Sequence, residues 1–140
     1  MAERPRRWPV AAGLALLLLL GYAAIAALLY ARQDALVYYP THTRVAATQT
    51  DFEVPVGDIR LRGWRVNPGR RDALLYFGGN AERIEAWREP FAEWFPTRTV
   101  YLVAYRGYGA SEGEPGQDAI LADALALYDE VRQRHPDGDI

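Results

Sequence analysis

A long apolar run near the N-terminus dominates the hydrophobic pattern of the chain. Val10 to Tyr30 contains no charged residue. About 20 consecutive apolar residues are enough to cross the hydrocarbon core of a bilayer, so residues 10–30 are predicted to be a transmembrane signal anchor. Arg4, Arg6 and Arg7 precede this run, and positive residues favour the cytoplasmic side. We therefore expect a single-pass membrane protein with residues 1–9 in the cytoplasm and an extracytoplasmic C-terminal domain.

A cleaved secretory signal peptide is the alternative interpretation of the same run. Ala24-Ile25-Ala26 is similar to the small-x-small site at which such peptides are cut. The run is longer than the roughly 7–15 apolar residues of a typical signal peptide, which favours an uncleaved anchor. Either interpretation exports the rest of the chain.

Two stretches of alternating, often β-branched residues follow a juxtamembrane connector at 31–47. They cover residues 50–56 and 59–66, and Gly57-Asp58 between them is a hairpin signal. The alternation of apolar positions changes phase at Gly63, which predicts a β-bulge there.

Strand-like and helix-like patterns then alternate along the chain. Residues 73–77 and 99–105 are short continuous apolar runs, as in strands buried on both faces. Residues 81–95 and 117–134 carry apolar side chains every three or four positions and are predicted to be amphipathic helices. Pro90 is expected to kink or divide the first of these helices.

This order of elements predicts an α/β domain over residues 48–140, in which parallel strands follow an antiparallel hairpin. His135-Pro136-Asp137-Gly138 is expected to end the second helix, and Asp139-Ile140 is similar to the first step of another strand. The predicted apolar stripe of the second helix consists of Ile120, Leu121, Ala124, Leu125, Tyr128 and Val131.

Composition excludes several kinds of chemistry. The chain has no cysteine, which rules out a lipoprotein anchor, a disulfide and a thiolate nucleophile. After residue 30, 13 arginines stand against 17 acidic residues without forming a cluster, so no nucleic-acid partner is expected. His42 and His135 are too few for a metal site, and no nucleotide-binding glycine motif is present. We therefore expect no metal and no cofactor.

Gly78-Gly79-Asn80 follows the first buried run and is expected to open the helix at 81–95. Glycines at such a junction let backbone N–H groups point into a common space, and a helix N-terminus adds partial positive charge. This arrangement suits an anion, either a phosphate or the oxyanion of acyl transfer. A plain strand-to-helix turn that needs glycine for its dihedral angles explains the same residues.

A second motif, Tyr105-Arg106-Gly107-Tyr108-Gly109-Ala110-Ser111-Glu112-Gly113, follows the second buried run. Together with Phe77-Gly78-Gly79-Asn80-Ala81 it resembles the α/β-hydrolase superfamily, and most of all its branch of membrane-anchored serine hydrolases. The resemblance covers roughly residues 31–140. It implies the N-terminal half of an α/β-hydrolase sheet, with the chain ending before the next strand and its nucleophile.

The resemblance also implies a site. The loop of Gly78 and Gly79 would form an oxyanion hole, with the backbone N–H of Asn80 as one donor. The full-length protein would cleave an ester, thioester or amide of a small-molecule or acyl substrate, and this chain alone would be inactive. Many relatives have His-Gly in place of Gly78-Gly79, where the histidine is thought to brace the loop, and an acidic residue in place of Ala104.

Ser111 is the only serine of the chain and lies in a G-x-S-x-G pattern from Gly109 to Gly113. A nucleophile elbow places its serine on a sharp turn between a strand and a helix, but residues 114–116 separate Ser111 from the predicted helix. We expect Ser111 to hydrogen-bond local backbone and not to act as a nucleophile. His135 is expected to interact with the dipole at a helix end, so no catalytic triad can be assembled.

The remaining charged residues have a simple interpretation. Glu82, Glu85, Glu89 and Glu93, with arginines between them, are expected on the solvated face of the helix at 81–95. A non-catalytic, membrane-tethered interaction module is the alternative to a hydrolase.

Overall fold

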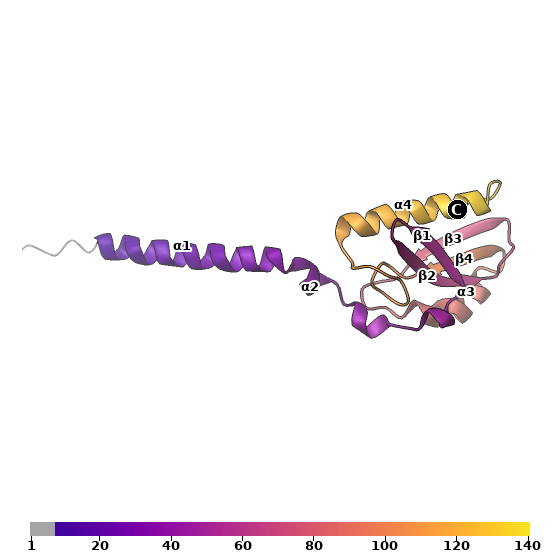
Figure 1. Ribbon diagram of the computed structural model, residues 1–140, viewed down its shortest axis with the longest axis horizontal. Helices are drawn as coiled ribbons and strands as arrows, with labels where there is room; N and C mark the ends of the chain where they lie inside the picture. Colours follow the sequence, from indigo (N-terminus) through magenta and orange to yellow (C-terminus); the bar gives the residue numbers. More distant parts are fainter. Residues whose placement is uncertain (1–7) are drawn as a thin grey trace, which may run out of the picture. The chain divides into compact units, whose positions relative to one another are not determined.

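The computed structural model describes residues 8–140, so the three arginines that underlie the predicted topology lie outside the described residues. Two compact units divide the chain between Val37 and Tyr38. Figure 1 shows their secondary structure. The later part of the connector predicted at 31–47 therefore belongs to the second unit.

The first unit is helical. Helix α1 (Trp8–Ala31) has a mean hydropathy of 2.4 and no buried residue, and by length and composition it could cross a membrane. A short helix, α2 (Gln33–Val37), follows it. A signal sequence has the same properties as α1, so the choice between an anchor and a signal peptide stays a prediction.

A mixed four-stranded sheet forms the second unit, in the order β1-β2-β4-β3. Strands β1 (Phe52–Val56) and β2 (Ile59–Val66) form the predicted antiparallel hairpin. Strand β4 (Arg98–Val103) runs antiparallel to β2 and parallel to β3 (Asp72–Phe77). The expectation of an α/β fold is confirmed.

Two helical layers cover the sheet, with α4 (Gln117–Arg134) on one face and α3 (Arg88–Trp94) on the other (Figure 1). The core beneath α4 consists of Phe52, Val54, Leu61, Ala73, Tyr101, Val103, Leu127 and Val131. The core beneath α3 consists of Trp64, Val66, Ile84, Phe91, Val100, Leu102, Ala104 and Tyr108. Strand β4 is central and contributes to both cores, as its continuous apolar run predicts.

The β-bulge predicted at Gly63 is wrong, because β2 pairs with β1 up to Gly63 and with β4 from Gly63 onward, and neither register skips a residue. The apolar pattern changes phase because the two halves of β2 bury opposite faces. Leu61 belongs to the core beneath α4, whereas Trp64 and Val66 belong to the core beneath α3. Glycine is needed at position 63 because a Cβ there would collide with the carbonyl oxygen of Leu102.

The helix predicted at 81–95 begins later than expected. A 3₁₀ turn, η3 (Ile84–Trp87), leads into α3, and residues 78–83 form an irregular loop. Ala81 has a φ of 60°, a left-handed conformation that an α-helix cannot contain. Pro90 lies in the first turn of α3, where backbone N–H groups lack intrahelical partners, so it neither kinks nor divides the helix. The predicted helix N-terminus at Gly78-Gly79-Asn80 is therefore wrong.

Helix α4 has the predicted bounds but a different packed face. Its fully buried residues are Asp123, Leu127 and Val131. Leu121, Leu125 and Tyr128, which belong to the predicted stripe, are 62%, 61% and 42% exposed. The apolar pattern predicted the wrong face because the packed face of the helix includes a buried polar residue. This residue is Asp123, which is paired with Arg106.

Strand β3 is less buried than its apolar run predicts. Only Ala73 is fully buried, and residues 74–77 are half-buried. On the edge of β3 that faces away from β4, the N–H of Ala73 donates a 2.8 Å hydrogen bond to the carbonyl of Asp139. Ile140 packs against the core beneath α4. The two C-terminal residues thus take the place that the first step of a further strand would occupy.

Candidate active site

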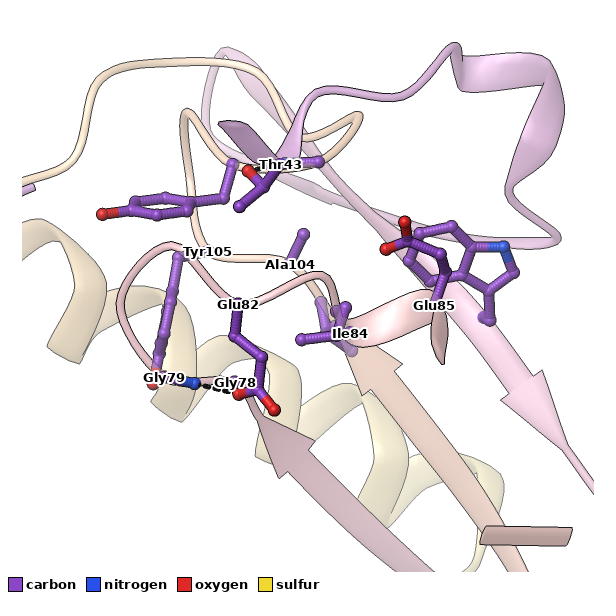
Figure 2. Close-up of a pocket in the computed structure, with 12 residues that line it drawn as sticks. Thr43, Gly78, Gly79, Glu82, Ile84, Glu85, Ala104 and Tyr105 are labelled. Atoms are coloured by element: carbon purple, nitrogen blue, oxygen red, sulfur yellow. Dashed lines mark hydrogen bonds between the residues drawn. The ribbon is translucent and has the colours of Figure 1, made fainter. Parts of the chain in front are cut away.

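Two loops meet at the carboxyl ends of β3 and β4, at residues 78–83 and 104–113 (Figure 2). Because these strands are parallel neighbours, their ends lie at the same edge of the sheet, where α/β sheets bind ligands. Glu82 and Ala104 help to line a small hollow between the loops. Its volume is about 10 Å³, which is roughly what one water molecule requires, so this hollow by itself does not accommodate an acyl substrate.

A buried tyrosine joins the two loops. The hydroxyl of Tyr108 donates a 2.7 Å hydrogen bond to Oδ1 of Asn80 and accepts one of 3.0 Å from the N–H of Tyr39. The N–H of Tyr39 also approaches Oδ1 of Asn80 at 3.2 Å. Burial raises the pKa of Tyr108, so the hydroxyl stays protonated and remains a donor. The side chain of Asn80 is thereby fixed from two other segments of the chain.

The segment after Tyr38 docks on the second loop through backbone groups. The N–H of Gly109 donates to Oγ1 of Thr43 at 3.1 Å, and the N–H of Val45 donates to the carbonyl of Gly109 at 3.3 Å. Gly109 has a φ of 52°, in the left-handed region that favours glycine. The specific Tyr-Arg-Gly-Tyr-Gly motif is therefore a junction between the connector, the Asn80 loop and the sheet.

Glu82 is the most heavily bonded carboxylate of the first loop. It accepts hydrogen bonds from the N–H of Gly79, the indole N–H of Trp87 and the hydroxyl of Tyr76. Burial alone would raise the pKa of Glu82, but these three donors outweigh it and hold the pKa below its ordinary value. The prediction of a solvated helix face is wrong for Glu82, because the residue lies in a loop and points at the end of β3 (Figure 2).

The other glutamates of this segment differ from Glu82. Glu85 is half-buried and forms an ion pair with the exposed side chain of Arg83, with 2.6 Å between Nη2 and Oε1. Glu89 and Glu93 are exposed, as predicted.

Gly78 leaves no room for a side chain in this arrangement, whereas Gly79 is less crowded. A Cβ at Gly78 would collide with Cγ2 of Ile84 and lie 3.1 Å from Oε2 of Glu82. A Cβ at Gly79 would lie 3.4 Å from the same oxygen. The glycine that stands in place of the relatives' histidine is therefore matched to Ile84 and Glu82.

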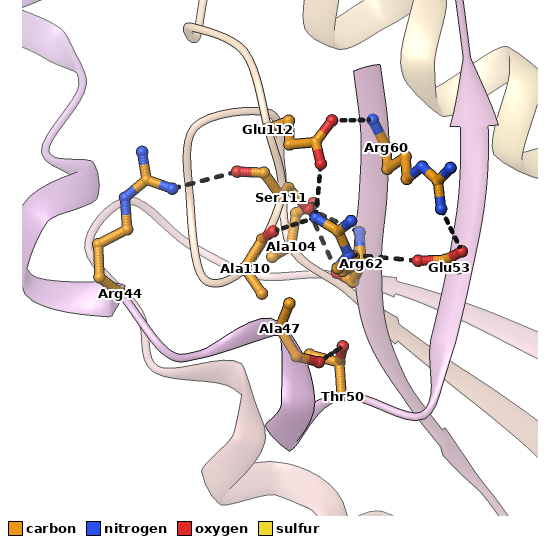
Figure 3. Close-up of polar contacts among 10 residues, drawn as sticks. All are labelled: Arg44, Ala47, Thr50, Glu53, Arg60, Arg62, Ala104, Ala110, Ser111 and Glu112. Carbon is orange, nitrogen blue, oxygen red and sulfur yellow. Dashed lines mark hydrogen bonds and ion pairs between the residues drawn. The ribbon is translucent and has the colours of Figure 1, made fainter. Parts of the chain in front are cut away.

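Ser111 is 1% exposed, and its hydroxyl bonds only to backbone groups among the described residues (Figure 3). Its Oγ accepts from the N–H of Arg62 at 2.8 Å and donates to the carbonyl of Ala104 at 2.7 Å. Ser111 thus supplies a hydrogen-bond partner to β2 beyond the end of β4. The expectation of a loop serine that bonds local backbone is confirmed.

His135 is buried at the C-terminal end of α4. It makes two side-chain hydrogen bonds, which are more specific than the predicted interaction with the helix dipole. Its Nδ1 lies 3.0 Å from the carbonyl of Arg71, and its Nε2 lies 2.9 Å from the hydroxyl of Tyr101. Because a carbonyl only accepts, Nδ1 carries a proton, and in the neutral ring Nε2 accepts from Tyr101. His42 is exposed, so in the described part of the chain neither histidine bonds to Ser111.

One interaction at the site has no counterpart among the sequence predictions. The guanidinium of Arg106 binds Asp123 in two places, from Nε to Oδ2 at 2.7 Å and from Nη2 to Oδ1 at 2.5 Å. The Asp123 side chain is only 3% exposed. The hydrogen bonds to Asp123 raise the pKa of Arg106, so the guanidinium stays protonated. An aspartate in the middle of the apolar run at 119–128 was the available signal.

The described residues hold no group of three or more His, Asp or Glu side chains that could bind a metal ion. The structure brings together Gly78, Gly79, Asn80 and the Tyr-Arg-Gly-Tyr-Gly loop, but among residues 8–140 it brings no serine to a histidine. The role of the Asn80 N–H stays a prediction.

Comparison with known proteins gives a consistent picture. No protein-family model matches the chain. The uncharacterized protein YfhR of Salmonella typhi is 35% identical over 110 residues, which cover 69% of this chain and 37% of the relative. The alpha/beta hydrolase domain-containing protein WAV2 of Arabidopsis thaliana is 33% identical over 127 residues, 77% of this chain and 41% of the relative. The similarity supports the α/β-hydrolase superfamily.

A third relative, Protein bem46 of Schizosaccharomyces pombe, is 34% identical over 73 residues, 50% of this chain and 24% of the relative. The chain spans less than half the length of each of these relatives.

Proposed function

We propose that this chain is the N-terminal, membrane-anchored portion of a serine hydrolase with the α/β-hydrolase fold. One observation carries the proposal: the Tyr108–Asn80 hydrogen bond of 2.7 Å, which joins the two motif loops at the carboxyl ends of neighbouring parallel strands. Ligands of α/β sheets bind at this edge. The sheet order β1-β2-β4-β3 and the similarity to an α/β-hydrolase domain protein support the same assignment.

In this proposal the loop of Gly78, Gly79 and Asn80 stabilises charge that develops during acyl transfer. The backbone N–H of Asn80 donates to the oxyanion of the tetrahedral intermediate, a contribution of about 3–4 kcal/mol for a donor of this kind. A second donor, the serine, its histidine and the acid come from other parts of the full-length protein, in the chain order serine, acid, histidine. The serine attacks an ester, thioester or amide carbonyl, and water hydrolyses the acyl-enzyme.

The proposed function also specifies on which side of a membrane the reaction takes place. Helix α1 anchors the protein in a membrane as a single pass, with the N-terminus in the cytoplasm and the sheet on the other side. The length and mean hydropathy of α1 support anchoring, and the arginines before it support this direction. The substrate is a small molecule or an acyl compound.

A serine-reactive fluorophosphonate probe tests the proposal. The 140-residue chain should not be labelled, whereas the longest product of the native gene should be labelled at a serine outside this chain. Ser111→Ala in that longer product is the matched control and should not reduce labelling. Absence of labelling in the longer product, or labelling of the 140-residue chain at Ser111, would contradict the proposal.

A membrane-tethered interaction module is the second candidate, and the exposed side chains of Leu121, Leu125 and Tyr128 on α4 favour it. Under this alternative the native product would remain unlabelled by the probe, and the Leu121→Glu/Leu125→Glu variant would abolish binding to its partner.

A further inference from the structure

We propose that Glu82 is the positioning residue of the oxyanion loop. Its carboxylate holds residues 78–80 through the N–H of Gly79, and it is held in turn by Tyr76 and Trp87. The oxyanion-binding role of this loop rests on the function proposed above. The bracing itself is a property of the loop and can be measured without any reaction.

Three different elements supply the donors to this one carboxylate. Tyr76 comes from β3, Trp87 from η3, and Gly79 from the loop between them. The Tyr76 hydroxyl reaches both carboxylate oxygens, at 3.0 and 3.2 Å. Hydrogen bonds to an ionised acceptor are about twice as strong as neutral ones. Glu82 therefore connects the end of the strand, the glycine loop and the first turn that follows it.

The donors are themselves fixed by packing. The ring of Phe91, in α3, lies 4.9 Å from that of Tyr76 and 5.7 Å from that of Trp87, measured between centroids. Phe91 is buried in the core beneath α3. The carboxylate is therefore held by groups that the core orients, so its position does not depend on a mobile side chain.

The loop closes on itself through a reciprocal pair. The N–H of Gly79 donates to the Glu82 carboxylate, while the N–H of Glu82 donates to the Gly79 carbonyl at 3.2 Å. Ala81 takes the left-handed conformation that makes this reversal possible. Asn80, between the two bonded residues, is thus restricted on both sides along the backbone, and its side chain is held by Tyr108.

The pairing of Gly79 with Glu82 gives the residues of this loop different roles. The Gly79 N–H is occupied by Glu82, so it serves the structure of the loop. It also explains the glycine at position 78, because any side chain there would meet Ile84 and Glu82.

Amide hydrogen exchange in the ¹⁵N-labelled, 140-residue chain in detergent micelles tests the bracing. Gly79 is exposed, so its amide should exchange at the rate of an unstructured peptide unless Glu82 protects it. We expect clear protection in the wild type and at least about tenfold faster exchange at Gly79 in Glu82→Gln, since the substitution replaces a charged acceptor with a neutral and weaker one. The indole N–H resonance of Trp87 should move upfield in the same variant.

Glu85→Gln is the matched control, because it removes a half-buried carboxylate from the adjacent turn without touching Gly79. It should leave the Gly79 amide and the Trp87 indole unchanged. An unprotected Gly79 amide in the wild type would overturn the proposal without any variant, and so would a Glu82→Gln spectrum in which neither resonance moves.

The bracing of the loop by Glu82 and the assignment as a hydrolase can each be contradicted without the other. Loss of the bracing is read from Gly79, whereas failure of the hydrolase assignment is read from an unlabelled longer gene product. Where that product is labelled, Glu82→Gln should lower its rate of labelling and Glu85→Gln should not. An unchanged labelling rate in Glu82→Gln would overturn the positioning role.

Discussion

The hydroxyl of Tyr108 and the carboxamide of Asn80 are 28 residues apart in sequence and 2.7 Å apart in space. The same hydroxyl accepts the N–H of Tyr39, so one side chain joins three segments. Tyr108→Phe keeps the ring and removes the bonds. We expect a loss of about 0.5–1.5 kcal/mol in the free energy of unfolding, because two part-buried hydrogen bonds are removed while their partners, Asn80 and Tyr39, stay exposed to water. Chemical denaturation measures this loss.

Tyr105→Phe is the control for that variant, since Tyr105 lies in the same loop and its hydroxyl bonds to no described residue. It should change the free energy of unfolding by less than about 0.5 kcal/mol. Equal losses in the two variants would contradict a special role for the Tyr108 hydroxyl.

The Arg106–Asp123 pair provides a second test. Asp123→Asn leaves a guanidinium without its ionised partner at a site where the aspartate is 3% exposed. We expect a loss of about 3–5 kcal/mol in the free energy of unfolding. Glu130→Gln breaks the more exposed pair with Arg134, on the same helix, and should cost only about 0.3–0.5 kcal/mol. A similar cost for both would show that burial of the Arg106–Asp123 pair is unimportant.

Acid should release the loop at residues 78–83. The pKa of Glu82 is lowered from 4.5 in the folded chain, so its ionised contacts stabilise the fold above pH 4.5 and are lost as the pH falls through the lower, folded pKa. Protection of the Gly79 amide should therefore persist to pH 4.5 and disappear below it. The Glu82→Gln variant should show no such transition. A release between pH 5 and 7 would contradict ionised bracing.

Ser111→Ala should lower stability without affecting catalysis. The change removes the acceptor of the Arg62 N–H and the donor to the Ala104 carbonyl, at a cost of about 1–3 kcal/mol in the free energy of unfolding. Thermal unfolding measures the loss, and phosphonate labelling of the longer gene product measures reactivity. A stable variant that has lost all labelling would instead make Ser111 the nucleophile.

The exposed stripe of α4 should control self-association. Leu121→Glu/Leu125→Glu replaces two side chains that are 62% and 61% exposed, so stability should change by less than about 0.5 kcal/mol for each. We expect less aggregation in light scattering because large exposed apolar patches favour association. Gln133→Glu, on the exposed end of the same helix, adds charge outside the stripe and should not have this effect.

Periodicity was sufficient to predict the hairpin, the parallel strands β3 and β4, and the bounds of α4, but not how far β3 is buried or which face of α4 packs on the sheet. It failed where tertiary contacts replace that regularity. Leu61 and Trp64 bury opposite faces of one strand and imitate a bulge. Glu82 has the spacing of a solvated helix position, yet it lies in a loop whose shape depends on Tyr76 and Trp87, contacts that no local pattern encodes.

Under the proposed membrane anchoring by α1, the connector contacts also bear on where the chain could be cut. Thr43 and Val45 bond to Gly109 in the second motif loop, and Tyr39 bonds to Asn80 and Tyr108 in both loops. A protease that cut after residue 45 would remove these partners and loosen both loops. Shedding that preserves the site must therefore cut on the N-terminal side of Tyr38, and a soluble version of the domain should keep its natural sequence from that residue onward.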